Sequence, residues 1–226
     1  MPQRVDLHTR LGLAYLQQER LAAAQEELEF ALVLGPDNSS AHHAMALLEL
    51  KLGHPVLARE HYERAIVADP GNYLVRNDFG SHLCALGLHL EGIDQLTVAV
   101  NDPFNPSRHI SHYRIGVCMN LSGRLEKAYA HLTKALRAQP SSGPVLYEAA
   151  DVSFRLGRHL PARGFLERYF EQGNPTPDSL LLAVRNERAL GSEPLVQHYA
   201  YQLRVSYPDS PQAAEVKELI SGAQGG

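Results

Sequence analysis

Apolar residues recur along the chain with the spacing of amphipathic helices that end at a proline. Residues 20–36, 54–70 and 124–140 each carry a small residue, a large residue four positions later and another small residue seven positions later. Such a stripe lies on one face of a helix, and its small side chains let a neighbouring helix approach closely. Proline then ends each helix. The matching residues are Ala24, Ala58 and Ala128; Leu28, Tyr62 and Leu132; Ala31, Ala65 and Ala135; and Pro36, Pro70 and Pro140.

A partner helix is predicted before each of these segments. Residues 11–15, 79–83 and 115–119 each place a large residue and then a glycine in that earlier helix, where glycine lets two helix backbones touch. The pattern predicts six helix-turn-helix units. Counted from the first helix of each pair, the units begin at residues 5, 39, 73, 109, 143 and 177, with spacings of 34, 34, 36, 34 and 34 residues.

A helix-turn-helix of 34 residues with this pattern resembles the tetratricopeptide repeat, and the resemblance covers residues 5–210. It implies an all-α, right-handed superhelical solenoid of about six units that cover one another's apolar faces. We interpret residues 1–4 as the remnant of a leader and residues 5–210 as one solenoid domain. We expect residues 211–226 to form a short capping helix and a flexible tail. The last two units depart from the motif, since Tyr169 replaces alanine and Val184 replaces glycine.

Composition and charge exclude several classes of protein. Of the 226 residues, 44% are hydrophobic and 20% charged, and no apolar run is long enough to span a membrane. The formal net charge is −4 and Lys and Arg do not cluster, so we expect no nucleic-acid partner. Cys84 and Cys118 are too few for a disulfide framework, and we interpret them as small buried residues rather than as a bridge.

The sequence contains none of the motifs GxSxG, HExxH, GxxxxGK[ST] and GxGxxG. We therefore predict no enzyme activity, no catalytic residue and no cofactor. His109 and His112, at i and i+3, are the best candidates for a metal site. However, His8, His42 and His112 all occupy the fourth position of their units, where the repeat usually packs a bulky side chain on the adjoining helix. We interpret these histidines as packing residues and predict no metal site.

In tetratricopeptide proteins the concave groove is lined by positions 2, 5, 9, 12 and 13 of each first helix. The resemblance therefore implies a protein partner bound at these positions, which are apolar in the first units and aromatic further along. Exposed apolar side chains in a groove suit an amphipathic helix or an extended peptide, unless neighbouring helices or the chain ends cover them. The candidate contacts are Leu13, Leu16, Leu47, Leu50, Tyr113, Val117, Tyr147 and Phe154.

A narrower pattern runs through nearly the whole chain after residue 5, in the stretches 11–50, 77–96, 101–118, 147–170, 179–192 and 207–211. It includes the wider joint between the third and fourth units. These stretches resemble a narrower family, the type IV pilus biogenesis and stability lipoproteins, or pilotins. The resemblance implies a non-enzymatic lipoprotein that binds subunits of the outer-membrane secretin and promotes localisation and multimerisation of the pore, so that pili and twitching motility can operate. We expect a monomer.

Residues 1–10 contain neither a signal-peptide pattern nor a cysteine that could carry a lipid. Members of the lipoprotein family begin with both. We therefore expect the periplasmic face of the outer membrane if a lipoprotein signal lies upstream of this sequence, and the cytoplasm otherwise. A membrane would be contacted only through a lipid anchor that this sequence does not contain. In the cytoplasmic case the protein would be an adaptor that assembles another complex.

Overall fold

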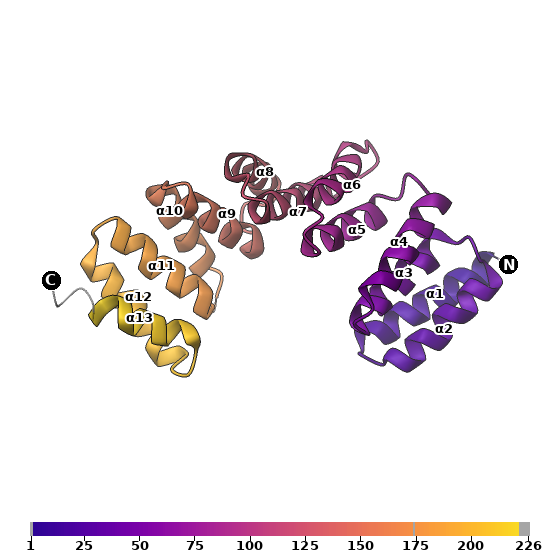
Figure 1. Cartoon of the computed structure of the whole chain (residues 1–226), viewed down its shortest axis with the longest axis horizontal. Helices are drawn as coiled ribbons and strands as arrows, with labels where there is room; N and C mark the ends of the chain where they lie inside the picture. Colours follow the sequence, from indigo (N-terminus) through magenta and orange to yellow (C-terminus); the bar gives the residue numbers. More distant parts are fainter. Residues whose placement is uncertain (1, 174, 222–226) are drawn as a thin grey trace. The chain divides into compact units, whose positions relative to one another are not determined.

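The computed structural model describes residues 2–173 and 175–221, and helices follow one another in pairs along these ranges (Figure 1). The described residues contain no β-strand, which confirms the all-α prediction. None of the described helices is both long and apolar enough to cross a bilayer.

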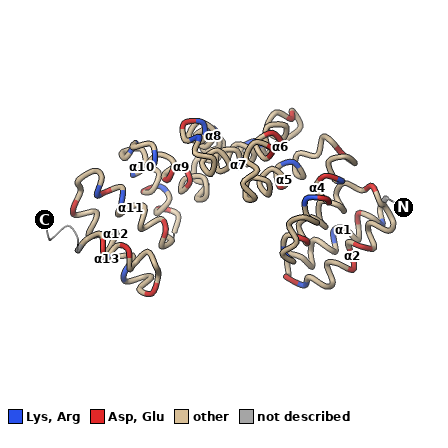
Figure 2. The backbone as a smooth tube through the Cα atoms, in the orientation of Figure 1, with Lys and Arg blue, Asp and Glu red and all other residues tan. Residues whose placement is uncertain are grey.

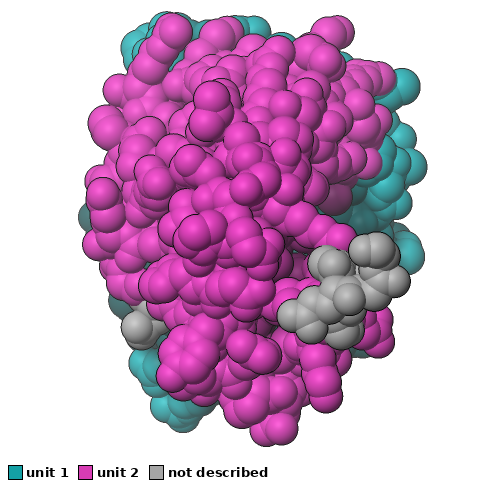
Figure 3. All heavy atoms as spheres, turned by 90° about the vertical axis from the view of Figure 1, so that its left-hand side faces the viewer, with its two compact units in different colours: residues 1–111 teal, residues 112–226 magenta. Residues whose placement is uncertain are grey.

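The chain divides into two compact units, which we call unit 1 (residues 1–111) and unit 2 (residues 112–226) (Figure 3). The boundary falls within α7 (Arg108–Leu121). Unit 1 contains α1 (Pro2–Gln17), α2 (Leu21–Leu34), α3 (Ser39–Lys51), α4 (Pro55–Ala68), α5 (Tyr73–Ala85) and α6 (His89–Asn101). Unit 2 contains α8 (Leu125–Ala138), α9 (Gly143–Arg155), α10 (His159–Phe170), α11 (Pro177–Ala189), α12 (Glu193–Ser206) and α13 (Pro211–Ser221).

The helices at both ends of the chain can be compared with the domain boundaries predicted from the sequence. Helix α1 begins at Pro2, so residues 2–4 belong to the first helix pair. Helix α13 occupies the place of the predicted capping helix, and the flexible tail predicted after it, residues 222–226, lies outside the described residues. A single solenoid domain over residues 5–210 stays a prediction.

Small residues set how closely the two helices of a pair approach. A Cβ atom added to Gly12 would lie 2.5 Å from Leu28 Cγ, and one added to Gly116 would lie 2.7 Å from the same atom of Leu132. The predicted close contacts are therefore confirmed. The alanines of the repeated stripe are buried in the same contacts: Ala24, Ala31, Ala58, Ala65, Ala128 and Ala135.

The turn inside each helix pair uses the left-handed backbone region. Glycine adopts it at five equivalent positions, with φ between 70° and 81°, because it has no Cβ to clash: Gly53, Gly87, Gly123, Gly157 and Gly191. The first pair has Glu19 at this position, with φ of 59°. Glu19 therefore holds a backbone conformation that L-residues with a side chain seldom adopt.

Side-chain caps begin several first helices. The side-chain oxygens of Asn38 and Asn72 accept hydrogen bonds from the backbone N–H groups of Ala41 and Val75. These bonds satisfy N–H groups that have no partner within the helix. The segments Pro36–Asp37–Asn38 and Pro70–Gly71–Asn72 therefore combine a helix stop with the next helix start.

Candidate functional site

In unit 1 the predicted partner contacts lie on the first helices α1 and α3. Leu13, Leu47 and Leu50 are partly exposed, and they pack at the edges of two core clusters. Leu16 is only 9% exposed and belongs to a core cluster with Leu28. Leu16 therefore supports its neighbours and offers little surface to a partner, whereas the other three leucines each present an edge.

A polar contact lies beside these leucines. His43 of α3 donates a hydrogen bond from Nε2 to Asp78 Oδ2 of α5, at 2.8 Å. Both side chains keep part of their surface in solvent, with exposed fractions of 16% and 26%. We call Leu13, Leu47 and Leu50, together with the His43–Asp78 pair, the first-helix row of unit 1. This row is apolar apart from one histidine–carboxylate pair, a composition that suits an amphipathic peptide.

In unit 2 the predicted contacts are more aromatic. Tyr113, Val117, Tyr147 and Phe154 are all partly exposed, and Tyr147 and Phe154 also pack against the core cluster around Leu166. Burial, followed by the charge of Asp178 and two further carboxylates, raises the pKa of Tyr147 to about 12. The phenol of Tyr147 is therefore uncharged at physiological pH, and carboxylates lie near it.

A hydrogen-bonded network joins α7 to α9 in unit 2. The amide nitrogen of Asn120 donates to Glu148 Oε1 at 2.8 Å and to Asp151 Oδ2 at 2.9 Å, while Arg155 donates to Asn120 Oδ1. Burial, aided by the charge of Asp151, raises the pKa of Glu148. The buried Asn120 thus holds two carboxylates and one guanidinium in fixed positions.

No motif within a single helix predicts the Asn120 network. Its members lie 28 to 35 residues apart along the chain, and only the packing of two first helices brings them together. The available signal was the repeat register, because Asn120, Asp151 and Arg155 all occupy positions assigned to the groove.

The fourth-position histidines pack on the second helix of their own pair, as predicted. His8 Nδ1 donates to Glu27 Oε2 at 2.6 Å. The Nδ1 atoms of His42 and His61 are 3.0 Å apart, and those of His112 and His131 are 3.1 Å apart. No group of three or more His, Cys, Asp and Glu side chains that could hold a metal ion occurs within residues 2–173 and 175–221.

The two imidazole pairs consist of neutral rings. His42 Nε2 donates to the carbonyl of Pro36, so the Nδ1 atom of the neutral ring must accept the hydrogen from His61. Burial lowers the pKa of His42 and His61, and it lowers the pKa of His131 to about 4, with the charge of His112 as the second cause.

The interpretation of the cysteines as small unbridged residues is wrong. Cys84 and Cys118 are both disulfide-bonded, and the described part of the chain holds no free cysteine. Both side chains are buried. The number of cysteines alone could not reveal this state, because it depends on neighbours in three dimensions.

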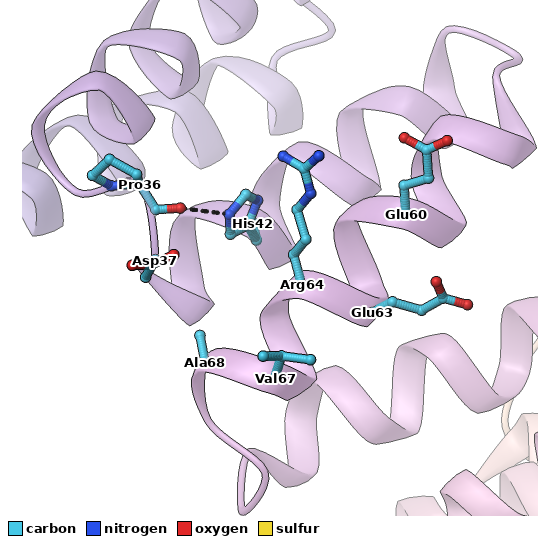
Figure 4. A pocket seen from close by; sticks show the side chains of 8 residues that line it. All are labelled: Pro36, Asp37, His42, Glu60, Glu63, Arg64, Val67 and Ala68. Carbon is cyan, nitrogen blue, oxygen red and sulfur yellow. Dashed lines mark hydrogen bonds between the residues drawn. The ribbon is translucent and has the colours of Figure 1, made fainter.

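Two pockets lie in unit 1 beside the C-terminal ends of α4 and α6. Pocket A has a volume of about 820 Å³ and lies between the α2–α3 turn and α4. Figure 4 shows Glu60, Glu63 and Arg64 projecting from α4, with Asp37 and His42 on the facing side. Pocket B, about 690 Å³, lies between the α4–α5 turn and the end of α6.

Comparison with known proteins supports the repeat assignment. Residues 9–73 match the model of the tetratricopeptide repeat family. The chain is 28% identical over 205 residues to the type IV pilus assembly protein PilF of Pseudomonas aeruginosa, an alignment that covers 91% of this chain and 81% of PilF. The resemblance inferred from the sequence is therefore confirmed.

Solved structures extend the similarity to the whole fold. The structure of Pseudomonas aeruginosa PilF matches with a TM-score of 0.87 and 27% identity, covering 96% of this chain and 98% of that one. PilW, described as a widely conserved type IV pilus biogenesis factor, matches with a TM-score of 0.89 and 26% identity, covering 94% and 97%. A tetratricopeptide repeat protein from Parabacteroides merdae has a TM-score of 0.69 at 16% identity, with 96% and 84% covered, and shows the fold alone.

Proposed function

We propose that this chain, a tetratricopeptide repeat protein with the solenoid fold of PilF and PilW, is a type IV pilus biogenesis factor that binds subunits of the outer-membrane secretin. Its role would be to assist localisation and multimerisation of the pore, without catalysis of its own. Tetratricopeptide scaffolds are generally non-catalytic and bind protein partners.

The observation that carries this proposal is similarity along the full length of the chain. Repeats resemble one another easily, so a match over two units would support only the fold. Here the alignment with PilF covers nine-tenths of the chain in sequence, and the structures of PilF and PilW match almost end to end. The wider joint between the third and fourth helix pairs, which contributed to the resemblance in sequence, lies within that aligned range.

The state of the cysteines supports an oxidising compartment. Disulfides persist in the bacterial periplasm, whereas the cytosol keeps most thiols reduced. Two buried, disulfide-bonded cysteines therefore favour the periplasm over the cytosolic adaptor. We include in the proposal that the protein works at the periplasmic face of the outer membrane, held there by a lipid on an upstream segment.

Secretin would bind along the first-helix row of unit 1. Leu13, Leu47 and Leu50 present apolar edges there, and the His43–Asp78 pair adds a polar contact. An amphipathic segment could cover the leucines and place a hydrogen-bonding group against the pair. Leu16 would act only as a support beneath this row.

Binding of purified secretin domains by calorimetry tests this mode. Leu13→Gln and Leu50→Gln should each weaken binding at least tenfold, because a polar group would enter an apolar contact. Leu57→Gln is the matched control, since Leu57 is 44% exposed on the second helix α4. Melting followed by circular dichroism identifies variants that remain folded at the assay temperature. Unchanged binding by both folded variants would exclude this row as the secretin site.

The compartment is tested separately by mass spectrometry of the native protein from cell fractions. An upstream segment that ends in a lipid-modified cysteine, recovered with the outer membrane, is the expected result. An unmodified chain that begins at Met1 or Pro2 in the cytosol would contradict the proposal and leave the adaptor function.

A further inference from the structure

Unit 1 carries a second apolar surface, which includes none of Leu13, Leu47 and Leu50. Val67 of α4 is 83% exposed beside pocket A, and Val98 of α6 and Phe104 are 47% and 86% exposed beside pocket B. Ala68 lines pocket A, and the next residue along the chain, Asp69, lines pocket B. We call this region, from pocket A across Val67 to Phe104, the α4–α6 surface.

Phe104 is held in place although it is exposed. Its backbone N–H donates to Asp102 Oδ1 at 2.8 Å. The next residue, Asn105, is 3% exposed, and its side-chain amide donates to the carbonyl of Ala99 at 2.8 Å and to Ser111 Oγ at 3.1 Å. The backbone of the turn is therefore anchored on both sides of Phe104, which reduces the loss of backbone entropy when this residue binds a partner.

The charge around the two pockets is negative. Five carboxylates line them, against the guanidinium groups of Arg64 and Arg76, and one of the five, Glu63, also pairs with Arg59. Figure 2 shows the acidic residues of α4 and α6 in red. Arg76 is directed to the carbonyl of Pro70 and to Gln95, which leaves Arg64 as the less engaged cation of the two. The carboxylates are those of Asp37, Glu60, Glu63, Asp69 and Asp102.

The ends of the helices add to this charge. Helix α4 ends at Ala68 and α6 ends at Asn101, so the carbonyl ends of both helices border the pockets. The C-terminus of a helix carries a partial negative charge that favours cations. A ligand at this surface would therefore gain from positive charge placed next to apolar side chains.

The surface is not a general property of the repeat. In the fourth helix pair, the positions equivalent to Arg64 and Val67 are Lys134 and Arg137 of α8. The exposed valine of α4 is thus replaced by a cation, and no carboxylate–valine combination recurs there. The fourth helix pair therefore lacks the α4–α6 surface.

We propose that the α4–α6 surface docks a basic, amphipathic segment of a protein partner, with an aliphatic or aromatic side chain in each pocket and Lys or Arg beside the carboxylates. An anionic lipid surface is the less favoured occupant, because the five carboxylates would repel it. This inference does not depend on the function proposed above, since none of Leu13, Leu47 and Leu50 lines either pocket.

A labelled synthetic peptide of eighteen residues, with Leu at i, i+4 and i+7 positions and Lys elsewhere, is a suitable probe. Fluorescence anisotropy with the full chain should give saturable binding. The matched peptide with Glu in place of Lys should bind at least tenfold more weakly. Phe104→Ser and Val67→Ser should each weaken binding of the Lys peptide at least fivefold, with no change in melting temperature, because both side chains are mostly in solvent.

Val56→Ser is the matched control, because Val56 is 70% exposed on α4 but lines neither pocket. The inference is overturned if Val56→Ser weakens binding as much as Phe104→Ser, or if the Glu peptide binds equally well. It is also overturned if Phe104→Ser abolishes sedimentation with vesicles of phosphatidylcholine and phosphatidylglycerol while leaving peptide binding unchanged. Loss of secretin binding in the Leu13 and Leu50 variants, with peptide binding intact, would separate the two surfaces.

Discussion

The third and the sixth helix pairs form the same hairpin, but with residues of different size where their two helices meet. In α5–α6 of unit 1 the equivalent contact positions hold Gly80, Gly92 and Ala99, and a Cβ added to Gly92 would lie 2.7 Å from the Gly80 carbonyl oxygen. In α11–α12 of unit 2 the same positions hold buried valine and leucine side chains: Val184, Val196 and Leu203. The first pair brings its backbones together, and the second packs side chains between them.

The polar contacts of these two helix pairs also differ. Arg76 donates to Gln95 across the α5–α6 pair at 2.6 Å, whereas Leu180 and Tyr199 occupy these positions in the α11–α12 pair. The buried ion pair of the sixth helix pair lies instead at its junction with the fifth, where Glu187 of α11 is 1% exposed and receives two hydrogen bonds from Arg163 of α10. Small motif residues are therefore not necessary for the hairpin, because larger apolar side chains fill the same positions in α11–α12.

The largest expected effect comes from the buried ion pair that joins α10 to α11 in unit 2. Arg163→Leu should destabilise the chain by about 4 kcal/mol, since Glu187 would stay buried without its cation. Urea unfolding followed by circular dichroism measures this change. Arg59→Leu is the control in unit 1, because Arg59 pairs with Glu63 and Glu91 at the surface, where such pairs contribute about 0–1 kcal/mol. Equal losses for the two variants would contradict the importance of the buried pair.

Gly80→Val tests whether the α5–α6 hairpin tolerates the valine that the α11–α12 hairpin carries at the equivalent position. Its Cβ would lie 2.6 Å from Leu96 Cγ and 2.8 Å from the Gly92 carbonyl oxygen, so we expect destabilisation of about 3 kcal/mol. Gly164→Val is the control, because a Cβ at Gly164 meets nothing within 4 Å. Since valine already occupies the equivalent position 184, a neutral result for Gly80→Val would mean that local helix separation adapts freely.

Acid should lower the stability of the helix pairs that contain the two imidazole pairs. It should have little effect on helix pairs that are packed through apolar side chains. Burial lowers the pKa of all four rings in the His42–His61 and His112–His131 pairs, so below about pH 6.5 the unfolded chain binds protons that the folded chain does not. Stability should be full above that pH and fall as the pH drops toward 4. The expected loss between pH 7.5 and pH 5 is about 2 kcal/mol, allowing for solvent screening.

The double change His112→Leu with His131→Phe isolates the imidazole effect, because it installs the residues that the fifth pair carries as Leu146 and Phe165. Urea titrations at several pH values should show a smaller acid loss for this variant. It also separates the imidazoles from Glu148, whose raised pKa favours the folded state at lower pH. An unaltered pH profile would rule out the pair as a source of acid sensitivity.

The smallest expected effect is a gain in the first pair. Glu19 holds φ of 59° where the other five pairs have glycine, so Glu19→Gly should stabilise the chain by about 1 kcal/mol. Glu19→Gln keeps the strained backbone and removes only the exposed contact with Lys51 at 3.7 Å, and should change stability by less than about 0.5 kcal/mol. Thermal melts that fail to separate the two variants would argue against backbone strain at this turn.

The helix pairs could be predicted from the sequence because their determinants are local. Alanine and glycine at fixed offsets specify which helix faces meet, and Pro36, Pro70 and Pro140 mark where second helices have ended. The departures at Tyr169 and Val184 were visible too, although not how unit 2 accommodates them.

The rest required three-dimensional neighbours. The Asn120 network and the Arg163–Glu187 pair join residues 24 to 35 positions apart, beyond any pattern within one helix. The anchored turn at Phe104 depends on Asn105 reaching back to Ala99. Leu16 fits the groove register yet is buried, because register gives the direction of a side chain but not what covers it.

The most direct measurement of the proposed function is the secretin multimer in cells that lack this protein. Semi-native gels of outer membranes should show the multimer lost on deletion and restored by the wild-type chain expressed with a lipoprotein signal. The Leu13→Gln and Leu50→Gln variants, present at wild-type levels, should restore it poorly. A secretin multimer that forms equally well in the deletion strain would contradict the account.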